Sequence, residues 1–293
     1  MYSVGLKILK ETIFLKNLQV YMNTKLSSAI CFSHIGQRPN HEDNFLVNGF
    51  YLAPDLQRQM SDNRCYFFSE PDLSGVRLYA VSDGMGGHNA GEVASRICVE
   101  KLALAQKELQ RHDSIKSAVA YLQTVIAEIN NTVCNLSHTQ DEFKGMGATL
   151  VLFVICGADY AILNIGDSRA YHFNNDALIQ ITKDHTEGQR MLDLGLLTRK
   201  ELSGFPARKN LNRYIGYGQN GYVLQADEYY PILDNGVMLL CSDGISDYLP
   251  DSRISEILHS ANNLESAGKQ LVNEAVASHD ADNATVMLIP LRR

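Results

Sequence analysis

The chain has 293 residues, of which 45% are apolar and 20% are charged, with 21 glycines and 7 prolines. This composition is typical of a globular protein with a sizeable core, and it excludes collagen-like, low-complexity and disordered chains. The formal net charge is −7. An anionic surface repels a phosphate backbone, so we expect no nucleic-acid partner.

The ends and the cysteines of the chain indicate its compartment. The six cysteines are scattered without a C-x-x-C pair, and several stand within apolar runs. We interpret them as buried free thiols in a reducing compartment, which predicts a cytoplasmic protein. The longest apolar runs are too short for a membrane span. Lysines and Glu11 interrupt the apolar start, which argues against a signal peptide. Residues 1–24 are interpreted as an N-terminal extension or an over-called translation start, and residues 25–293 as a single domain.

Strands and helices are predicted from apolar runs and their spacing. Strands are expected over residues 27–36, 45–52, 76–84, 149–156, 160–166, 169–173, 177–182, 223–230, 236–244 and 284–289. Helices are expected over residues 89–109, 113–136 and 263–277, and residues 53–76 are interpreted as a loop. The strands after Gly147 predict an antiparallel meander. The fold class is α+β, with one sandwich of sheets covered by helices.

A segment of different character lies between residues 184 and 220. It mixes short helical signals with glycine and proline, and Thr198 and Glu201 have the spacing of a capping box. Segments of this kind commonly overlie a functional site.

Aspartates stand at the ends of buried strands. Asp83 and Asp243 each end an apolar run and precede a glycine, and Asp282 directly precedes another run. Glu42 and Asp43 follow the first strand by one loop. A single Asp-Gly pair is typical of a turn. Its repetition favours a cluster of carboxylates, which is unstable unless a multivalent cation compensates it.

The types of donor atom narrow the choice of cation. The candidates are oxygen ligands, with no H-E-x-x-H motif and no Cys/His cluster, which favours Mg²⁺ or Mn²⁺ over Zn²⁺. Two such ions can share a water, lower its pKa and direct it at phosphorus. Gly84 and Gly244 allow the chain to turn sharply beside an ion. These residues predict hydrolysis of a phosphoester.

Seven segments together resemble the metal-dependent protein Ser/Thr phosphatases of the PPM or type 2C family, in its bacterial branch. They are GQRPNHED (36–43), SDGMGGHNAGEVAS (82–95), MGATLV (146–151), NIGDSRAY (164–171), TKDHT (182–186), LLCSDGISD (239–247) and DADNATVMLI (280–289). They follow the order of the family and cover about residues 27–290. The resemblance implies an antiparallel β-sandwich flanked by helix pairs on both faces, with a binuclear metal centre at one end and a variable flap over about 186–220.

The resemblance also implies roles for individual residues. Asp83 matches the ligand that bridges both metals, Gly84 a backbone-carbonyl ligand, and Asp243 and Asp282 ligands of the second metal. Glu42 and Asp43 match the acidic pair that binds directly or through water. Asp167 and Asp247, with Asp243, match a looser third metal site. Arg38 matches the arginine that binds phosphate, for which its planar fork is suited. The cofactors implied are two or three Mg²⁺ or Mn²⁺ ions.

Several residues also allow other interpretations. Arg38 alone would be read as a surface ion pair, and Asp167 as a turn residue. A histidine follows the Asp-Gly pair in the animal branch as a proposed general acid, but this chain has Met85 there. His88 is therefore kept only as an alternative candidate for proton transfer. His41 replaces a common asparagine, and Cys241 is interpreted as a core thiol. The glycines at 84–91 fail the G-x-G-x-x-G pattern, and GDSRA fails G-x-S-x-G.

The predicted function is hydrolysis of phosphoserine and phosphothreonine in proteins by a metal-bridged water, with no covalent intermediate. Two alternatives stay open: a catalytically silent phosphoprotein-binding module of the same fold, and a small-molecule phosphoesterase. The expected partners are phosphorylated proteins and, by analogy, an opposing Ser/Thr kinase. We expect a monomer.

Overall fold

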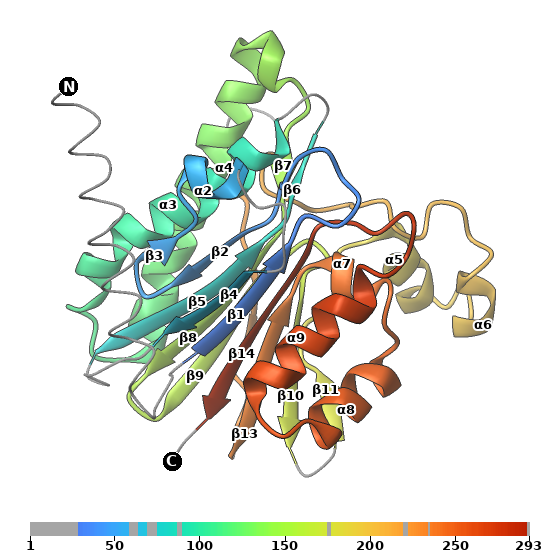
Figure 1. Ribbon diagram of the computed structural model, residues 1–293. Helices are drawn as coiled ribbons and strands as arrows, with labels where there is room; N and C mark the ends of the chain where they lie inside the picture. Colours follow the sequence, from blue (N-terminus) through green and yellow to red (C-terminus); the bar gives the residue numbers. More distant parts are fainter. Residues whose placement is uncertain are drawn as a thin grey trace, which may run out of the picture.

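Two six-stranded antiparallel sheets form the centre of the molecule (Figure 1). The computed structural model describes residues 29–58, 64–68, 75–86, 90–174, 177–218, 222–233 and 235–291. The first sheet has the order β11-β10-β13-β14-β1-β4. Its strands are β1 (Ala29–His34), β4 (Arg64–Phe68), β10 (Arg169–Asn174), β11 (Ala177–Gln180), β13 (Gly236–Cys241) and β14 (Ala284–Leu291).

The second sheet has the order β12-β9-β8-β5-β2-β3. Its strands are β2 (Asn44–Val47), β3 (Phe50–Tyr51), β5 (Val76–Ser82), β8 (Leu150–Cys156), β9 (Asp159–Ile165) and β12 (Asp227–Tyr229). A two-stranded ribbon of β6 (Gly84–Met85) and β7 (Gly147–Ala148) continues from β5 and leads into β8. The predicted antiparallel sandwich is confirmed.

Helices cover both outer faces of the sandwich, as predicted (Figure 1). The pair α3 (Gly91–Leu109) and α4 (Ile115–Thr139) packs on the second sheet. The pair α8 (Asp251–Ser260) and α9 (Leu264–Ala275) covers the first sheet, after the short α7 (Asp243–Ser246). Each helix pair thus encloses one apolar layer, and a third layer lies between the sheets. Within the described residues, no helix combines the length and apolar character needed to cross a bilayer.

Strand β5 illustrates how the sequence builds these layers. Successive side chains of a strand point to opposite faces. Leu78 and Ala80 face the α3 and α4 layer, whereas Tyr79 and Val81 face the layer between the sheets. Both faces are buried, so the strand is a continuous apolar run rather than an alternating one. Complete burial of each large side chain stabilises the fold by about 1.5–3 kcal/mol.

Two predictions about the elements were wrong, and one helix was missed. Residues 53–76 contain a short helix, α2 (Pro54–Arg58), and strand β4, which pairs with β1. Helix α8 was not predicted, although Ile254, Ile257 and Leu258 form its buried stripe. The meander ends after β9, because β10 crosses to the other sheet and pairs with β13. A pattern of single strands does not show that the chain changes sheets at the turn after Gly166.

The segment predicted as a flap lies beside the sandwich and outside both sheets (Figure 1). It contains α5 (Glu187–Asp193) and α6 (Arg199–Leu202). The capping box of Thr198 and Glu201 is confirmed. Two attachments fix the ends of the segment: the His185 N–H donates to the Gly166 carbonyl at 2.9 Å, and Ile215 pairs with Ala148. Residues 1–24 lie outside the described residues.

Candidate metal centre

The antiparallel register brings the predicted acidic residues to one end of the sandwich. The last residue of β5, Ser82, pairs with Asn44 at the start of β2. The last residue of β13, Cys241, pairs with Val286 near the start of β14. In such an antiparallel pair, the residue that follows the end of one strand lies beside the residues that precede the start of the other strand. This places Asp83 near Glu42 and Asp43, and Asp243 near Asp282, as the sequence predicted.

Asp83 and Gly84 form the turn from β5 into β6. The Asp83 N–H donates to Thr149 Oγ1 at 3.0 Å, and the Asp83 carbonyl accepts from the Thr149 N–H at 2.8 Å. The Gly84 N–H donates to the Glu42 carbonyl at 3.2 Å. A Cβ on Gly84 would lie 2.0 Å from the Gly91 carbonyl oxygen, so only glycine fits where α3 begins against this turn.

The acidic pair of Glu42 and Asp43 is held by its neighbours. Asp43 is fully buried, and its Oδ2 accepts a hydrogen bond from Ser242 Oγ at 2.8 Å. The Glu42 N–H donates to Asn283 Oδ1 at 2.7 Å, and the Glu42 carbonyl accepts from Ser95 Oγ at 2.5 Å. These bonds join the ends of β2, β13 and β14 and the start of α3.

Two basic side chains contact the remaining acids. Arg38 Nη2 lies 2.6 Å from Asp282 Oδ2, and the Arg38 side chain is 52% exposed. Lys209 Nζ, from the flap, lies 2.5 Å from Asp247 Oδ2. Asp167 follows β9 in the turn that also contacts His185. The predicted acids therefore converge, with Asp247 and Asp167 on the flap side.

Burial and mutual repulsion disturb the titration of the inner acids. Burial raises the pKa of Asp83 well above its usual value, and the carboxylates of Asp43 and Asp243 raise it further. Burial raises the pKa of Asp43 to about 7, with Asp243 adding to the effect. The pKa of Asp243 rises to about 6, through burial and through Asp247. Like charges in a site of low dielectric constant disfavour one another's ionised forms.

The outer acids respond in the same direction. Burial raises the pKa of Glu42 to about 7, and Asp282 contributes. Burial and then Asp243 raise the pKa of Asp167 well above its usual value. The pKa of each of these five carboxyl groups at one end of the sandwich is therefore raised, so each is harder to ionise than a carboxyl group in water. Such a cluster is neutralised either by protons or by cations.

Two buried carboxylate oxygens test whether the site fits a metal ion. Asp43 Oδ1 and Asp243 Oδ1 are buried and have no hydrogen-bond partner. A buried polar atom without a partner is costly, and an oxygen-ligated divalent cation would satisfy both. Among the described residues no three His, Cys, Asp or Glu side chains are already arranged to hold an ion. The carboxylates instead contact Ser242, Arg38 and Lys209. The oxygen donors, with two of them buried and unpartnered, therefore fit Mg²⁺ or Mn²⁺.

Residues that support the acids were not predicted as site residues. Thr149, Ser242 and Asn283 each hold the backbone or carboxylate of a predicted ligand. All three stand within the motifs MGATLV, LLCSDG and DADNAT, so their position was a usable signal. Lys209 had no signal, because it reaches Asp247 from 38 residues away along the chain.

The histidine and cysteine predictions have different outcomes. His41 is 2% exposed, and its Nε2 lies 3.0 Å from Ser33 Oγ behind the acidic pair. Cys241 is a buried core residue, as predicted, and all six thiols are free. The prediction that the cysteines are buried was wrong for Cys65 and Cys156, which are only partly buried. The prediction about His88 lies outside the described residues.

Asp83, Asp243, Asp282, Glu42 and Asp43 form what we call the acidic end of the sandwich. This cluster and the fold around it are those of a metal-dependent protein phosphatase. The family model "Protein phosphatase 2C" matches residues 65–276. The chain belongs to this family, and it is a metal-dependent protein Ser/Thr phosphatase.

Curated relatives share this assignment. The chain is 32% identical over 212 residues to the serine/threonine phosphatase stp of Listeria innocua, covering 72% of this chain and 83% of that protein. It is 34% identical over 221 residues to the serine/threonine protein phosphatase PstP of Mycobacterium tuberculosis, covering 73% of this chain and 40% of that protein.

Solved structures agree with the fold. Stp1 from Staphylococcus aureus superposes with a TM-score of 0.74 at 28% identity, covering 92% of this chain and 96% of that chain. The catalytic domain of PstP in complex with two manganese ions superposes with a TM-score of 0.66 at 27% identity, covering 90% of this chain and all of that chain.

Proposed function

We propose that the phosphatase reaction takes place at the acidic end of the sandwich, with Asp83, Asp243, Asp282 and the Gly84 carbonyl as the principal metal ligands. The unpartnered oxygens of Asp43 and Asp243 carry this proposal. Glu42 and Asp43 complete the ligand set, directly or through water. Divalent ions bound here supply Lewis acidity and lower the pKa of water toward neutrality.

Arg38 is proposed to bind the phosphoryl group of the substrate. Its guanidinium has five N–H donors in a planar fork, and it stands half-exposed at the rim with one contact to Asp282. A phosphate that enters beside Asp282 would find a bidentate partner there. Arg38 thus orients the substrate, while the neighbouring carboxylates bind the divalent ions.

We propose four further points about the site, the compartment, the oligomeric state and the substrates. A third cation site is formed by Asp167, Asp247 and Asp243. Their carboxylates repel one another, and a bound cation would offset this repulsion. The protein acts in the cytoplasm, because its six thiols are free. It acts as a monomer, because its own helices cover both outer faces of the sandwich. Its substrates are phosphoproteins, which a kinase must supply by phosphorylating Ser or Thr.

Substitution of the central ligands tests the proposal. Asp83→Asn and Asp243→Asn should lower kcat for p-nitrophenyl phosphate with Mn²⁺ by about 10³-fold, because several kcal/mol of transition-state stabilisation are lost. Both should weaken Mn²⁺ binding in calorimetry. Asp159→Asn is the matched control, because Asp159 starts β9 at the opposite end of the sandwich. Turnover of wild-type size in either variant would disprove the ligand assignment.

A further inference from the structure

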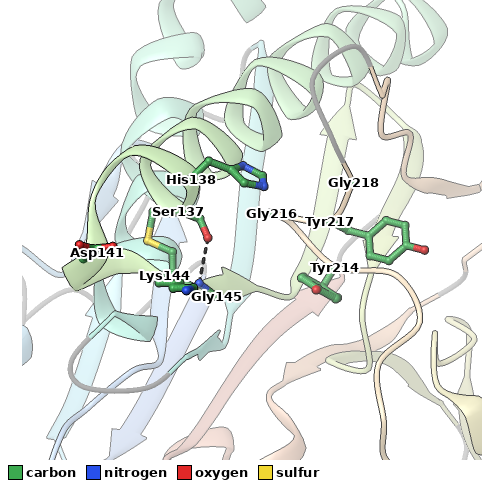
Figure 2. Close-up of a pocket in the computed structure, with 10 residues that line it drawn as sticks. Ser137, His138, Asp141, Lys144, Gly145, Tyr214, Gly216, Tyr217 and Gly218 are labelled. Carbon is green, nitrogen blue, oxygen red and sulfur yellow. Dashed lines mark hydrogen bonds between the residues drawn. The ribbon is translucent and has the colours of Figure 1, made fainter.

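A groove lies between α4 and the last part of the flap (Figure 2). Ser137 and His138 come from α4 on one side, and Tyr214 and Tyr217 from the 214–218 segment on the other. Its volume is about 730 Å³, which falls within the range of ligand sites. The proposed catalytic residues do not line this groove.

Hydrogen bonds fix both walls of the groove. Asn130 of α4 is 1% exposed, accepts the Gly216 N–H at 2.7 Å and donates to the Tyr217 carbonyl at 3.3 Å. Ser137 Oγ accepts the Gly145 N–H at 2.9 Å (Figure 2). The groove is therefore formed before a ligand arrives, which reduces the entropy cost of binding.

The lining offers both ring faces and polar groups. Tyr217 is 39% exposed, and its ring lies edge-on to Tyr214 with centroids 5.4 Å apart. His138 Nδ1 lies 2.7 Å from the Cys134 carbonyl; since a carbonyl only accepts, Nδ1 carries the hydrogen and Nε2 is left for a ligand. Lys144 adds a charge at the rim. This mixture suits a polypeptide, with an apolar side chain against the rings and its backbone against polar groups.

A short extended segment connects the groove to the catalytic end. Met146 lines the groove, β7 follows it, and the Thr149 N–H then donates to the Asp83 carbonyl. The three steps from Met146 to Thr149 cover about 10 Å at ~3.3 Å per residue. At Gly147, a Cβ would lie 2.8 Å from both Met85 Cε and Tyr214 Cδ2. The groove and the catalytic floor thus share one tightly packed boundary.

We propose that this groove binds the polypeptide on one side of the substrate's phosphoresidue, about three to four positions away. An extended substrate chain advances by the same ~3.3 Å per residue as the segment between Met146 and Thr149. This inference rests on the proposed function, because the number of positions is counted from the groove to Asp83 as the site of catalysis. It predicts selectivity for an apolar or aromatic residue at that position.

Phosphopeptides of increasing length test the groove. Starting from a phosphoserine with one flanking residue on each side, we would add one to five residues on either side. In the wild type, kcat/KM should rise about tenfold when a Leu or Phe reaches the third or fourth position on one side, which corresponds to burial of one apolar side chain. The rise should lie mainly in KM. Extension that changes nothing on either side would overturn the proposal.

Substitution in the groove provides the second half of the test. Tyr217→Ala and Lys144→Ala should lessen the gain from extension while leaving turnover of p-nitrophenyl phosphate within twofold. Tyr230→Ala and Lys116→Ala are the controls, because Tyr230 is 46% exposed outside the groove and Lys116 is an exposed residue near the start of α4. An equal loss with both kinds of substrate would overturn the proposal in favour of a general effect on the site. Complete loss of p-nitrophenyl phosphatase activity in Asp83→Asn would still support the proposed function.

Discussion

The middle and the acidic end of the sandwich are built from the same strands, but burial of side chains has opposite effects on stability in the two regions. In the middle, side chains such as Phe153 and Tyr79 are fully buried and gain stability simply by leaving water. At the end, Asp43 is equally buried and loses stability when it leaves water, unless something of opposite charge replaces the solvent. The middle therefore stabilises the fold, whereas the acidic end needs protons or cations to offset its buried charge.

A substitution in the core should lower the stability of the fold without changing the affinity of the acidic end for metal ions. Phe153→Ala removes a fully buried ring from the layer between the sheets. It should lower the free energy of unfolding by about 3–5 kcal/mol, measured by urea denaturation. The folded fraction should keep the metal affinity of the wild type. Leu104→Ala is the control, since Leu104 is 76% exposed, and it should cost less than about 0.5 kcal/mol. Equal effects of the two substitutions would contradict the packing described here.

His41 sharpens the comparison because its burial acts in the opposite direction to that of the acids. Burial lowers its pKa to about 4. Below about pH 6.5 the unfolded chain gains a proton that the folded chain does not accept, so stability falls as the pH falls from 6.5 to 4. At pH 5 the loss from this residue should be about 2 kcal/mol. His41→Asn should remove this part of the pH dependence, measured by urea denaturation of the metal-free protein at pH 7.5 and 5. An unchanged difference between the two pH values would contradict it.

The smallest effect concerns the flap. The Lys209 and Asp247 side chains are 56% and 23% exposed, so Lys209→Ala should change stability by less than about 1 kcal/mol. Removing a positive charge beside the acidic end should strengthen Mg²⁺ binding by about two- to fivefold in calorimetry. Lys183→Ala is the matched control, because Lys183 forms a comparable ion pair with Asp193 at 2.7 Å. Weaker Mg²⁺ binding in Lys209→Ala would contradict the placement of this lysine.

The sequence predicted the acidic end better than it predicted the elements around it. Asp83, Asp243 and Asp282 stand beside strands whose limits are visible as apolar runs, and antiparallel pairing then brings them together. Helix α8 was missed because its ten residues carry only three buried apolar side chains. The crossing of β10 was missed because pairing with the nearest strand is the simplest expectation for a short turn.

Contacts between distant segments could not be predicted. The pairing of Lys209 with Asp247 and the anchoring of Gly216 by Asn130 join residues 38 and 86 positions apart. No local pattern marks either pair, because both depend on how the flap is attached to the sandwich. The groove beside α4 depends on the same attachment, and no local sequence pattern indicates it.

The dependence of stability on pH, with and without Mg²⁺, tests the central claim most directly. In EDTA, the raised pKa values of Glu42 and Asp43, both about 7, mean that the folded state binds more protons than the unfolded state between about pH 4 and 7. Stability should therefore fall as the pH rises through this range. His41→Asn is the suitable background, since it removes the opposing contribution. With Mg²⁺ at about 100 times its Kd, the ion should add about 2.7 kcal/mol at pH 7.5 and much less at pH 5. Parallel curves in EDTA and in Mg²⁺ would contradict a cation at the acidic end.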